Sequence, residues 1–291
     1  GKDNVYIWEK GEKKLHENEA AEILREMCQG EYMHPTPVKE GKIELVADID
    51  GLLKVNSDKI KKVNSMGEMM IASRHGNFAV KKGDKLAGTR IIPLVIEKEK
   101  MESAKAVCEG QTILSLKPFV HKKVGIVTTG NEVYYHRIED TFTPVIKEKL
   151  AEYDTEVIGQ VVCNDDHEKI TKAILSFIEK GADPVLCTGG MSVDPDDKTP
   201  LAIKNTGAKI VSYGAPVLPG AMFLLSYYNE DIPIVGLPGC VMYAKRTIFD
   251  LALPRMMADD KITAEELAEL GEGGLCLNCS VCTFPNCGFG K

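Results

Sequence analysis

The chain has 291 residues, of which 44% are hydrophobic and 27% are charged, a composition typical of a globular protein large enough for two domains. Its net charge of −7 disfavours nucleic acid as the main partner. No apolar run reaches the length of a membrane span, and the N-terminus lacks the apolar core of a signal peptide. We therefore expect a cytoplasmic protein that binds neither nucleic acid nor membrane.

Residues 1–118 are predicted to form a β-rich α+β domain. The apolar patterns indicate a strand at Val5–Trp8, a helix over 18–28, a strand pair within 41–55, a short helix capped by Ser57, strands at 69–73 and 87–96, and a charged stretch at 97–102. The histidines of this region are isolated, and isolated histidines are rarely ligands. No chemistry is therefore predicted here.

After Pro118 the pattern changes to strands that alternate with helices, which predicts an α/β domain over 119–260. The predicted strands are 123–128, 156–162, 185–187, 209–213, 222–227 and 232–235, and the predicted helices are 142–153, one capped by 164–166 that ends at Lys180, 200–206 and 243–257. Such a sheet is mostly parallel and is covered by helices on its faces. Ligands of these sheets bind at the carboxyl ends of the strands.

The most informative stretch runs from Val185 to Asp197. The apolar run Val185–Cys187 predicts the end of a buried strand, and Thr188-Gly189-Gly190 then predicts a sharp turn whose glycines permit positive φ and close approach of backbone N–H groups to a ligand. Ser192 is a candidate helix cap, and an anion would sit well at the start of that helix. Carboxylates at 194, 196 and 197 suit a divalent cation that bridges to a phosphate. An acidic surface turn is the alternative.

Loops also follow the strands at 129–132 and 236–239, so three loops are expected to converge at one edge of the sheet. The last of them, Gly236-Leu-Pro-Gly239, is by itself typical of an ordinary strand-to-helix turn. Their convergence favours a binding site more strongly than any one loop does.

The sequence resembles the molybdopterin-binding domain of molybdenum-cofactor biosynthesis proteins, the gephyrin-like family, over about residues 122–257. The resemblance is carried, in the family's order, by Gly125-Ile-Val-Thr-Thr-Gly-Asn-Glu132, Asp165-Asp166, Thr188-Gly-Gly-Met-Ser-Val-Asp-Pro-Asp-Asp197, Leu218-Pro-Gly220 and Gly236-Leu-Pro-Gly239. It implies a three-layer, mostly parallel α/β domain whose Gly-rich loops hold the pterin and its phosphate. The implied cofactor-binding residues are Thr129, Gly130, Thr188, Gly189, Gly190, Ser192, Pro219, Gly220, Gly236, Pro238 and Gly239.

By the same resemblance, the catalytic, metal-associated positions are Asp197, Glu132, Asp165 and Asp166, with Mg²⁺ as the cation. Three departures from the family pattern are visible. Asn131 stands where the family usually carries Asp, Ala221 where insertase-like members carry Lys, and Cys240-Val241 where Asn-Pro is usual. Cys240 is either a soft metal ligand or a small buried hydrophobe. These changes leave pterin binding intact but weaken the case for adenylation or molybdate insertion.

The C-terminal segment, 261–291, is predicted to hold a metal. A helix over 262–270, capped by Thr263 with Glu266, leads into glycines at 271, 273 and 274 that we interpret as a hinge. Cys276, Cys279, Cys282 and Cys287 follow at spacings typical of metal ligands. With no sign of secretion, we expect an iron–sulfur cluster or zinc rather than disulfides. A reduced, disordered tail is the alternative.

The leading hypothesis is a protein that binds molybdopterin and acts in molybdenum-cofactor biosynthesis or handover. If it is an enzyme, the resemblance implies a Mg-dependent molybdopterin adenylyltransferase or molybdenum transferase. The second hypothesis is a non-catalytic cofactor carrier or redox sensor that uses the Cys-rich tail. The third is a nucleotide-processing module like that of the competence-damage-inducible proteins. The expected partners are a pterin or phosphate small molecule, molybdoenzymes or iron–sulfur proteins, and further copies of the chain.

Overall fold

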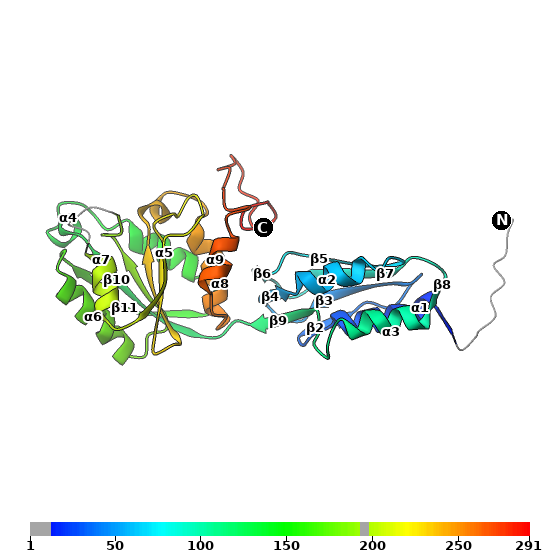
Figure 1. Cartoon of the computed structure of the whole chain (residues 1–291). Helices are drawn as coiled ribbons and strands as arrows, with labels where there is room; N and C mark the ends of the chain where they lie inside the picture. Colours follow the sequence, from blue (N-terminus) through cyan, green and yellow to red (C-terminus); the bar gives the residue numbers. More distant parts are fainter. Residues whose placement is uncertain (1–12, 193–197) are drawn as a thin grey trace. The chain divides into compact units, whose positions relative to one another are not determined.

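The computed structural model describes residues 13–192 and 198–291. The chain divides into two compact units, Gly1–Pro118 and Phe119–Lys291 (Figure 1). Each unit has its own strands and helices and is described by itself. The strand predicted at Val5–Trp8 lies outside the described residues.

The first unit is β-rich. Its elements are β1 (Lys14–His16), α1 (Glu17–Cys28), β2 (Met33–Pro35), β3 (Lys42–Ala47), β4 (Gly51–Val55), α2 (Ser57–Asn64), β5 (Met69–Ser73), β6 (Phe78–Val80), β7 (Lys85–Ile91), β8 (Val95–Glu97), α3 (Lys98–Ala106) and β9 (Leu114–Pro118). The strands form sheets of order β2-β3-β7-β5 and β6-β4-β9, and β1 pairs with β8. Helix α1 buries Ala20, Ala21 and Leu24 at helical spacing, which explains its strong apolar signal.

Three predictions for this unit need correction. Strands β3 and β4 exist where predicted, but they belong to different sheets and do not pair with each other. Helix α2 is capped by Asn56, whose side chain accepts from the Lys59 N–H group, and Ser57 is the first helical residue. The charged stretch after Glu97 is helix α3, which was not predicted. Its buried residues, Met101 and Ala104, are separated by charged and polar residues, so the apolar pattern is weak.

The second unit has a six-stranded sheet with helices on both faces. Its elements are β10 (Lys122–Thr129), α4 (Asn131–Tyr134), α5 (Phe142–Leu150), β11 (Thr155–Cys163), α6 (His167–Glu179), β12 (Val185–Thr188), α7 (Thr199–Asn205), β13 (Lys209–Tyr213), β14 (Leu224–Tyr228), β15 (Ile232–Leu237), the 3₁₀ turn η1 (Gly239–Met242), α8 (Ile248–Met257) and α9 (Ala264–Glu269). The strand order is β11-β10-β12-β15-β14-β13.

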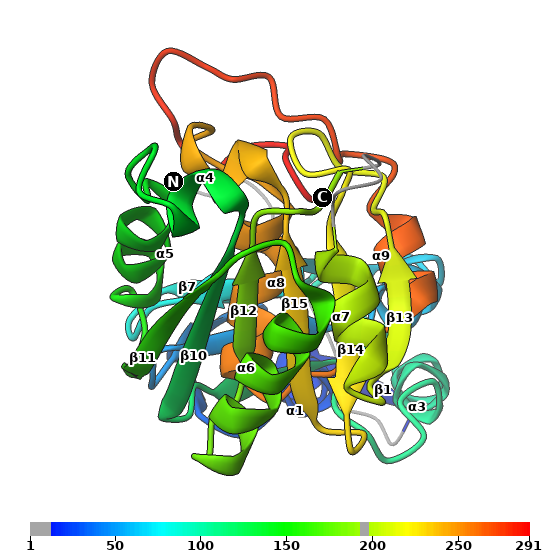
Figure 2. The same ribbon diagram turned by 90° about the vertical axis from the view of Figure 1, so that its left-hand side faces the viewer.

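Strands β11, β10, β12 and β15 are mutually parallel, and β14 runs antiparallel to both of its neighbours. Helices α6 and α7 cover one face of the sheet, and α5 and α8 cover the other (Figures 1 and 2). The predicted three-layer, mostly parallel α/β fold is therefore confirmed. Strand β12 is fully buried, as its continuous apolar run predicted.

One close contact fixes the packing of α6 on the sheet. The Phe177 ring lies against Gly125 of β10 and Gly159 of β11, where an added Cβ would come within 2.6 Å and 3.0 Å of the ring. Glycine at both positions gives the ring its space. Residues of α6, α7 and the sheet form one buried apolar cluster on this face.

Two boundaries near the loops differ from prediction. Helix α8 begins at Ile248 rather than near Tyr243, because Thr247 and Asp250 form a capping box at its start. Ser192 caps no helix among the described residues, since α7 begins at Thr199. In the part of the chain that the structure describes, no helix is long and apolar enough to cross a membrane.

Candidate functional site

A cavity of about 740 Å³ opens beyond the carboxyl ends of β12 and β15. Its lining comes from the turns after both strands, the loop before β14, η1 and the C-terminal segment. The lining residues are Phe142, Gly189, Gly190, Met191, Ser192, Leu218, Pro219, Gly220, Ala221, Met222, Pro238, Gly239, Cys240, Tyr243, Leu275 and Cys276. The volume lies within the range of small-molecule sites, about 300–1,000 Å³. Of the predicted cofactor-binding residues, Gly189, Gly190, Ser192, Pro219, Gly220, Pro238 and Gly239 meet here.

The Gly189-Gly190 turn presents backbone rather than side chains to this cavity. Both residues have positive φ, 83° and 55°, and a Cβ on Gly189 would lie 2.2 Å from the Thr129 carbonyl oxygen. Among the described residues, the N–H groups of Gly190 and Met191 donate to no protein acceptor. Consecutive unpaired N–H groups at a cavity wall form an anion-binding arrangement.

Two threonines hold this turn from behind. The Thr129 hydroxyl donates to the Thr188 carbonyl oxygen at 3.1 Å and pairs with the Thr199 hydroxyl at 2.9 Å. The Thr199 hydroxyl also lies 2.9 Å from the Gly189 carbonyl oxygen. The buried Thr188 hydroxyl has no hydrogen-bond partner within the described ranges. Neither Thr129 nor Thr188 lines the cavity. Both therefore affect its shape only through the glycine turn that they support.

The facing wall is built from the loops at Leu218 and Pro238. Gly220 packs against Ile248, and an added Cβ would meet that side chain at 2.4 Å. Gly239 differs, because a Cβ there would meet no atom within 4 Å. Gly236 does not reach the cavity; it lies within β15, against Met191.

The rim of the cavity is apolar and exposed, a feature that the sequence pattern did not indicate. Leu218, Tyr243 and Leu275 are exposed by 57%, 79% and 63%. Exposed large apolar side chains gathered at a cavity mark a surface that a flat, partly apolar ligand can cover. They come from three distant parts of the sequence.

The carboxylates that the resemblance singled out do not line the cavity where they are described. Asp166 caps α6, with its Oδ1 accepting from the N–H groups of Glu168 and Lys169, and these bonds lower its pKa. Asp165 accepts from the Asn131 N–H group at 3.0 Å, which ties the loops after β10 and β11 together. Glu132 lies exposed in the single turn of α4. Asp197 lies outside the described residues.

Gly130 begins α4 with a φ of 131° and lines no part of the cavity. Cys240 does line it, from η1. Burial raises the pKa of the Cys240 thiol, so this group stays protonated at neutral pH. A protonated thiol is a poor metal ligand.

Comparison with known proteins agrees with this geometry. A family model described as a probable molybdopterin binding domain matches residues 125–258. Residues 125–258 are thus similar to that domain family. The match begins in β10 and ends just after α8, so it includes every strand and loop of the six-stranded sheet.

Curated relatives cover less of the chain. CinA-like proteins of Mycobacterium tuberculosis and Mycobacterium avium are 32% and 31% identical over 80 residues, 28% of this chain. The aligned part is 19% and 18% of their length, so the chain matches less than a fifth of these relatives. The solved molybdopterin biosynthesis enzyme MoaB of Thermus thermophilus is 21% identical, with a TM-score of 0.40, covering 49% of this chain and 98% of its own.

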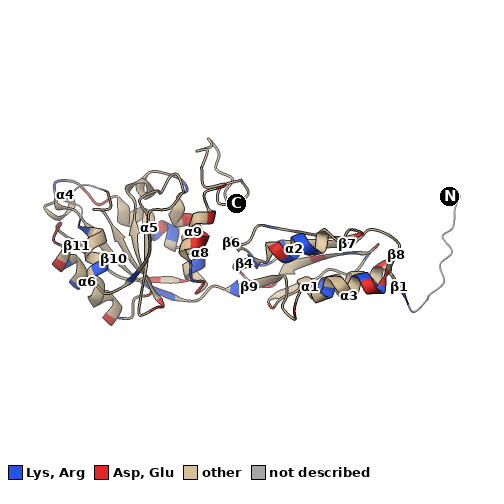
Figure 3. Ribbon diagram, in the orientation of Figure 1, with Lys and Arg blue, Asp and Glu red and all other residues tan. Residues whose placement is uncertain are grey.

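Beyond the residues that the family model matches, residues 273–291 form a closed loop that we call the cysteine tail. The Gly290 N–H group donates to the Gly273 carbonyl oxygen at 2.9 Å, which joins the ends of the loop. Leu275 pairs in parallel with Leu218 of the cavity wall. Figure 2 shows the tail running across the end of the unit where the loops after β12 and β15 lie. Figure 3 shows it as almost entirely uncharged, and residues 273–290 contain no Lys, Arg, Asp or Glu.

A second cavity, of about 210 Å³, lies inside the cysteine tail. All four tail cysteines line it, together with Lys245 and Arg246 from the segment before α8. Nevertheless, no three His, Cys, Asp or Glu side chains of residues 13–192 and 198–291 are grouped as metal ligands. The four thiols therefore share a cavity without converging on a point.

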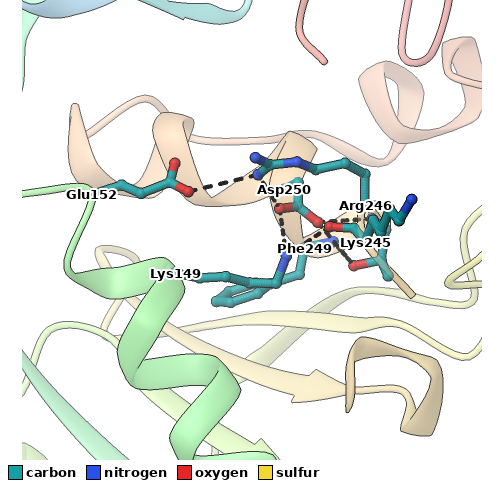
Figure 4. A network of polar contacts seen from close by, with 7 residues as sticks. Lys149, Glu152, Lys245, Arg246, Phe249 and Asp250 are labelled. Atoms are coloured by element: carbon teal, nitrogen blue, oxygen red, sulfur yellow. Dashed lines mark hydrogen bonds and ion pairs between the residues drawn. The ribbon is translucent and has the colours of Figure 1, made fainter. Parts of the chain in front are cut away.

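A buried polar network fixes the segment that carries Lys245 and Arg246 (Figure 4). Asp250 of α8 accepts from the Lys149 ammonium at 2.6 Å and from the Arg246 guanidinium at 2.8 Å. Next to Arg246, the Lys245 ammonium donates to the carbonyl oxygens of Cys279 and Ser280, at 3.2 Å and 2.9 Å. The Arg246 guanidinium also lies over the Phe284 ring, 4.9 Å from its centroid. The tail is thus held by Lys245 and Arg246, which precede α8, as well as by Leu218.

Proposed function

We propose that the cavity beyond β12 and β15 binds molybdopterin, and that the protein acts in molybdenum-cofactor biosynthesis or handover. The observation that carries this proposal is the coincidence of the family match with a cavity whose wall is the Gly189-Gly190 turn. The remaining features support the same ligand, because its phosphate and its flat ring system need different surroundings.

The unpaired N–H groups of Gly190 and Met191 suit the phosphate. The exposed Tyr243 ring and the Leu218 side chain suit the ring system at the rim. A divalent cation would be held by Asp197, as the resemblance implies, and would neutralise phosphate charge. Because Glu132 and Asp165 are placed outside the cavity, the geometry supports binding and handover better than an adenylyl or metal transfer that needs their carboxylates.

A graded series at Gly239 tests this proposal. The position lines the cavity, has no neighbour within 4 Å of an added Cβ and needs no positive φ, so side chains can be added without strain. We expect Gly239→Ala, Gly239→Val and Gly239→Phe to weaken molybdopterin binding progressively, by at least about tenfold for Phe. The readouts are fluorescence titration under anaerobic conditions and the melting temperature, which should not change.

Molybdopterin affinity that stays constant across the series, with an unchanged melting temperature, would show that the ligand binds elsewhere. Failure of the unmodified protein to bind molybdopterin would overturn the proposed function. The same titration with a nucleotide separates the third hypothesis. Tighter binding of a nucleotide than of molybdopterin, again weakened by Gly239→Phe, would assign the cavity to nucleotide chemistry.

We also propose that the cysteine tail holds a metal, as zinc or as an iron–sulfur cluster. The supporting observation is that Cys276, Cys279, Cys282 and Cys287 all line one small cavity. Four thiolates around a divalent metal carry excess negative charge, and the cations of Lys245 and Arg246 lie at the same wall. Elemental analysis of anaerobically purified protein should find zinc or iron, and Cys279→Ser/Cys282→Ser should abolish it. Protein without bound metal, and without uptake of Zn²⁺, would contradict this proposal.

A further inference from the structure

The molybdopterin cavity and the tail cavity share a wall. Leu275 and Cys276 line both of them. We propose, on the basis of the two binding functions above, that the cysteine tail is a regulatory wall of the molybdopterin cavity, so that metal binding by the tail and molybdopterin binding by the cavity are thermodynamically linked.

The shared wall is attached to the molybdopterin cavity through main-chain hydrogen bonds. The Leu218 N–H group donates to the Gly274 carbonyl oxygen at 2.8 Å, and the Cys276 N–H group donates to the Leu218 carbonyl oxygen at 2.8 Å. Leu218 is followed by Pro219 and Gly220, which line the molybdopterin cavity too. A displacement of Cys276 is therefore transmitted directly to the wall that faces the ligand.

Metal binding must change the tail, because its four thiols line one cavity without being grouped as ligands. Cys276 is held in the ladder with Leu218, whereas Cys279 and Cys282 are exposed. The exposed part of the loop is thus the part that can close on a metal, with Cys276 as the ligand that connects the metal to the Leu218 wall of the molybdopterin cavity. Closure would immobilise Leu275 and Cys276 in the position that completes the molybdopterin cavity.

We expect positive cooperativity between metal binding and molybdopterin binding. A metal that orders the wall removes part of the entropy cost that molybdopterin would otherwise meet, so each ligand should tighten the binding of the other. Couplings between sites are commonly about 5- to 150-fold in affinity. Linkage also requires that both factors be equal. Equality distinguishes a true coupling from damage caused by metal removal.

The experiment uses the full chain under anaerobic conditions, with Zn²⁺ and molybdopterin as the probes. Molybdopterin affinity is measured by fluorescence for the metal-free and Zn²⁺-loaded protein. Zn²⁺ affinity is measured by competition with a chromophoric chelator, with and without molybdopterin. We expect both affinities to rise by the same factor, at least about fivefold.

A matched pair of variants locates the coupling. Leu275 lines both cavities, whereas Leu277 is similarly exposed, at 79% against 63%, and lines the tail cavity alone. Both Leu275→Ala and Leu277→Ala keep all four cysteines. The factor by which each ligand raises the affinity for the other should fall towards one in Leu275→Ala and persist in Leu277→Ala. Both variants should still bind Zn²⁺.

The outcomes separate the three proposals. If both ligands bind the unmodified protein and neither affects the affinity of the other, the linkage is wrong while the two binding functions stand. If the anaerobically purified protein contains neither iron nor zinc and Zn²⁺ fails to bind, the tail site and the linkage are both overturned. If molybdopterin fails to bind, the proposed function and the linkage are overturned, and the tail site stands. An equal loss of coupling in Leu277→Ala would contradict the shared wall as its route.

Discussion

Removal of Lys149 tests how the buried network supports α8 and the tail. The Lys149 and Asp250 side chains are exposed by only 9% and 3%, and their charged groups lie 2.6 Å apart. After Lys149→Met, Asp250 keeps the Arg246 guanidinium at 2.8 Å and the Thr247 N–H group at 2.7 Å. Breaking a buried ion pair lowers the free energy of unfolding by about 3–5 kcal/mol when one charge is left without a partner. We expect a loss of about 2 kcal/mol here, because Asp250 keeps its other two partners.

Two further variants give the scale of this effect. Asp250→Ala removes the counterion of both cations and the capping box of α8, so its cost should fall within that range, at about 4 kcal/mol. Glu152→Gln should cost less than about 1 kcal/mol, because Glu152 is 54% exposed and lies 3.7 Å from Arg246. The order of destabilisation should be Asp250, then Lys149, then Glu152.

Hydrogen exchange by mass spectrometry on the full chain is the appropriate assay, because two compact units would both contribute to a spectroscopic unfolding signal. The free energy is read from peptides that contain α8 (Ile248–Met257). Equal losses in Lys149→Met and Asp250→Ala would refute the reasoning that Arg246 compensates Asp250. So would a Glu152→Gln loss as large as that of Lys149→Met.

Three other predictions follow from single contacts. Burial alone would raise the pKa of Asp140, but hydrogen bonds from Thr143, Gln160 and Phe142 lower it. The stability that Asp140 contributes is therefore present above its unfolded pKa and is lost as pH falls through the lowered pKa. In acid-unfolding curves, Asp140→Asn should destabilise at pH 7, and the difference from the unmodified protein should shrink as pH falls below the ordinary Asp range. Gly125→Ala should cost about 1–3 kcal/mol by overpacking, because the added Cβ would lie 2.6 Å from Phe177 Cγ and 2.8 Å from Phe177 Cβ; hydrogen exchange of peptides covering α6 measures the loss, and an unchanged exchange rate would contradict it. Asp166→Ala should lower the melting temperature and Asp166→Ser should restore most of it, while both keep full molybdopterin affinity; loss of binding in Asp166→Ser would assign this residue to the ligand.

The sheet of the second unit could be predicted because its signals are local. Buried strands such as Val185–Thr188 are continuous apolar runs, and the helices between them repeat apolar residues at helical spacing. Strand pairing in the first unit was not local: β3 and β4 adjoin in sequence yet join different sheets. The start of α8 was missed although Thr247 and Asp250 carry a readable capping pattern.

The candidate site could be predicted only in part for a related reason. The turns at 189–190 and 238–239 can be predicted from their residue types alone. The apolar rim does not, because Tyr243 and Leu275 come from separate segments that only the folded chain brings to one cavity. The role of Asp166 as a cap was predictable, because it stands directly before a helix, and the structure confirms it.

The central claim is that molybdopterin binds at the Gly189-Gly190 turn and the facing wall. Hydrogen exchange by mass spectrometry of the full chain, with and without saturating molybdopterin, tests it most directly. We predict that the ligand slows exchange in peptides covering 188–192, because it would occupy N–H groups that donate to no protein acceptor among the described residues, and in peptides covering 217–222 and 238–243. Protection confined to other segments, with these three unchanged, would contradict the claim.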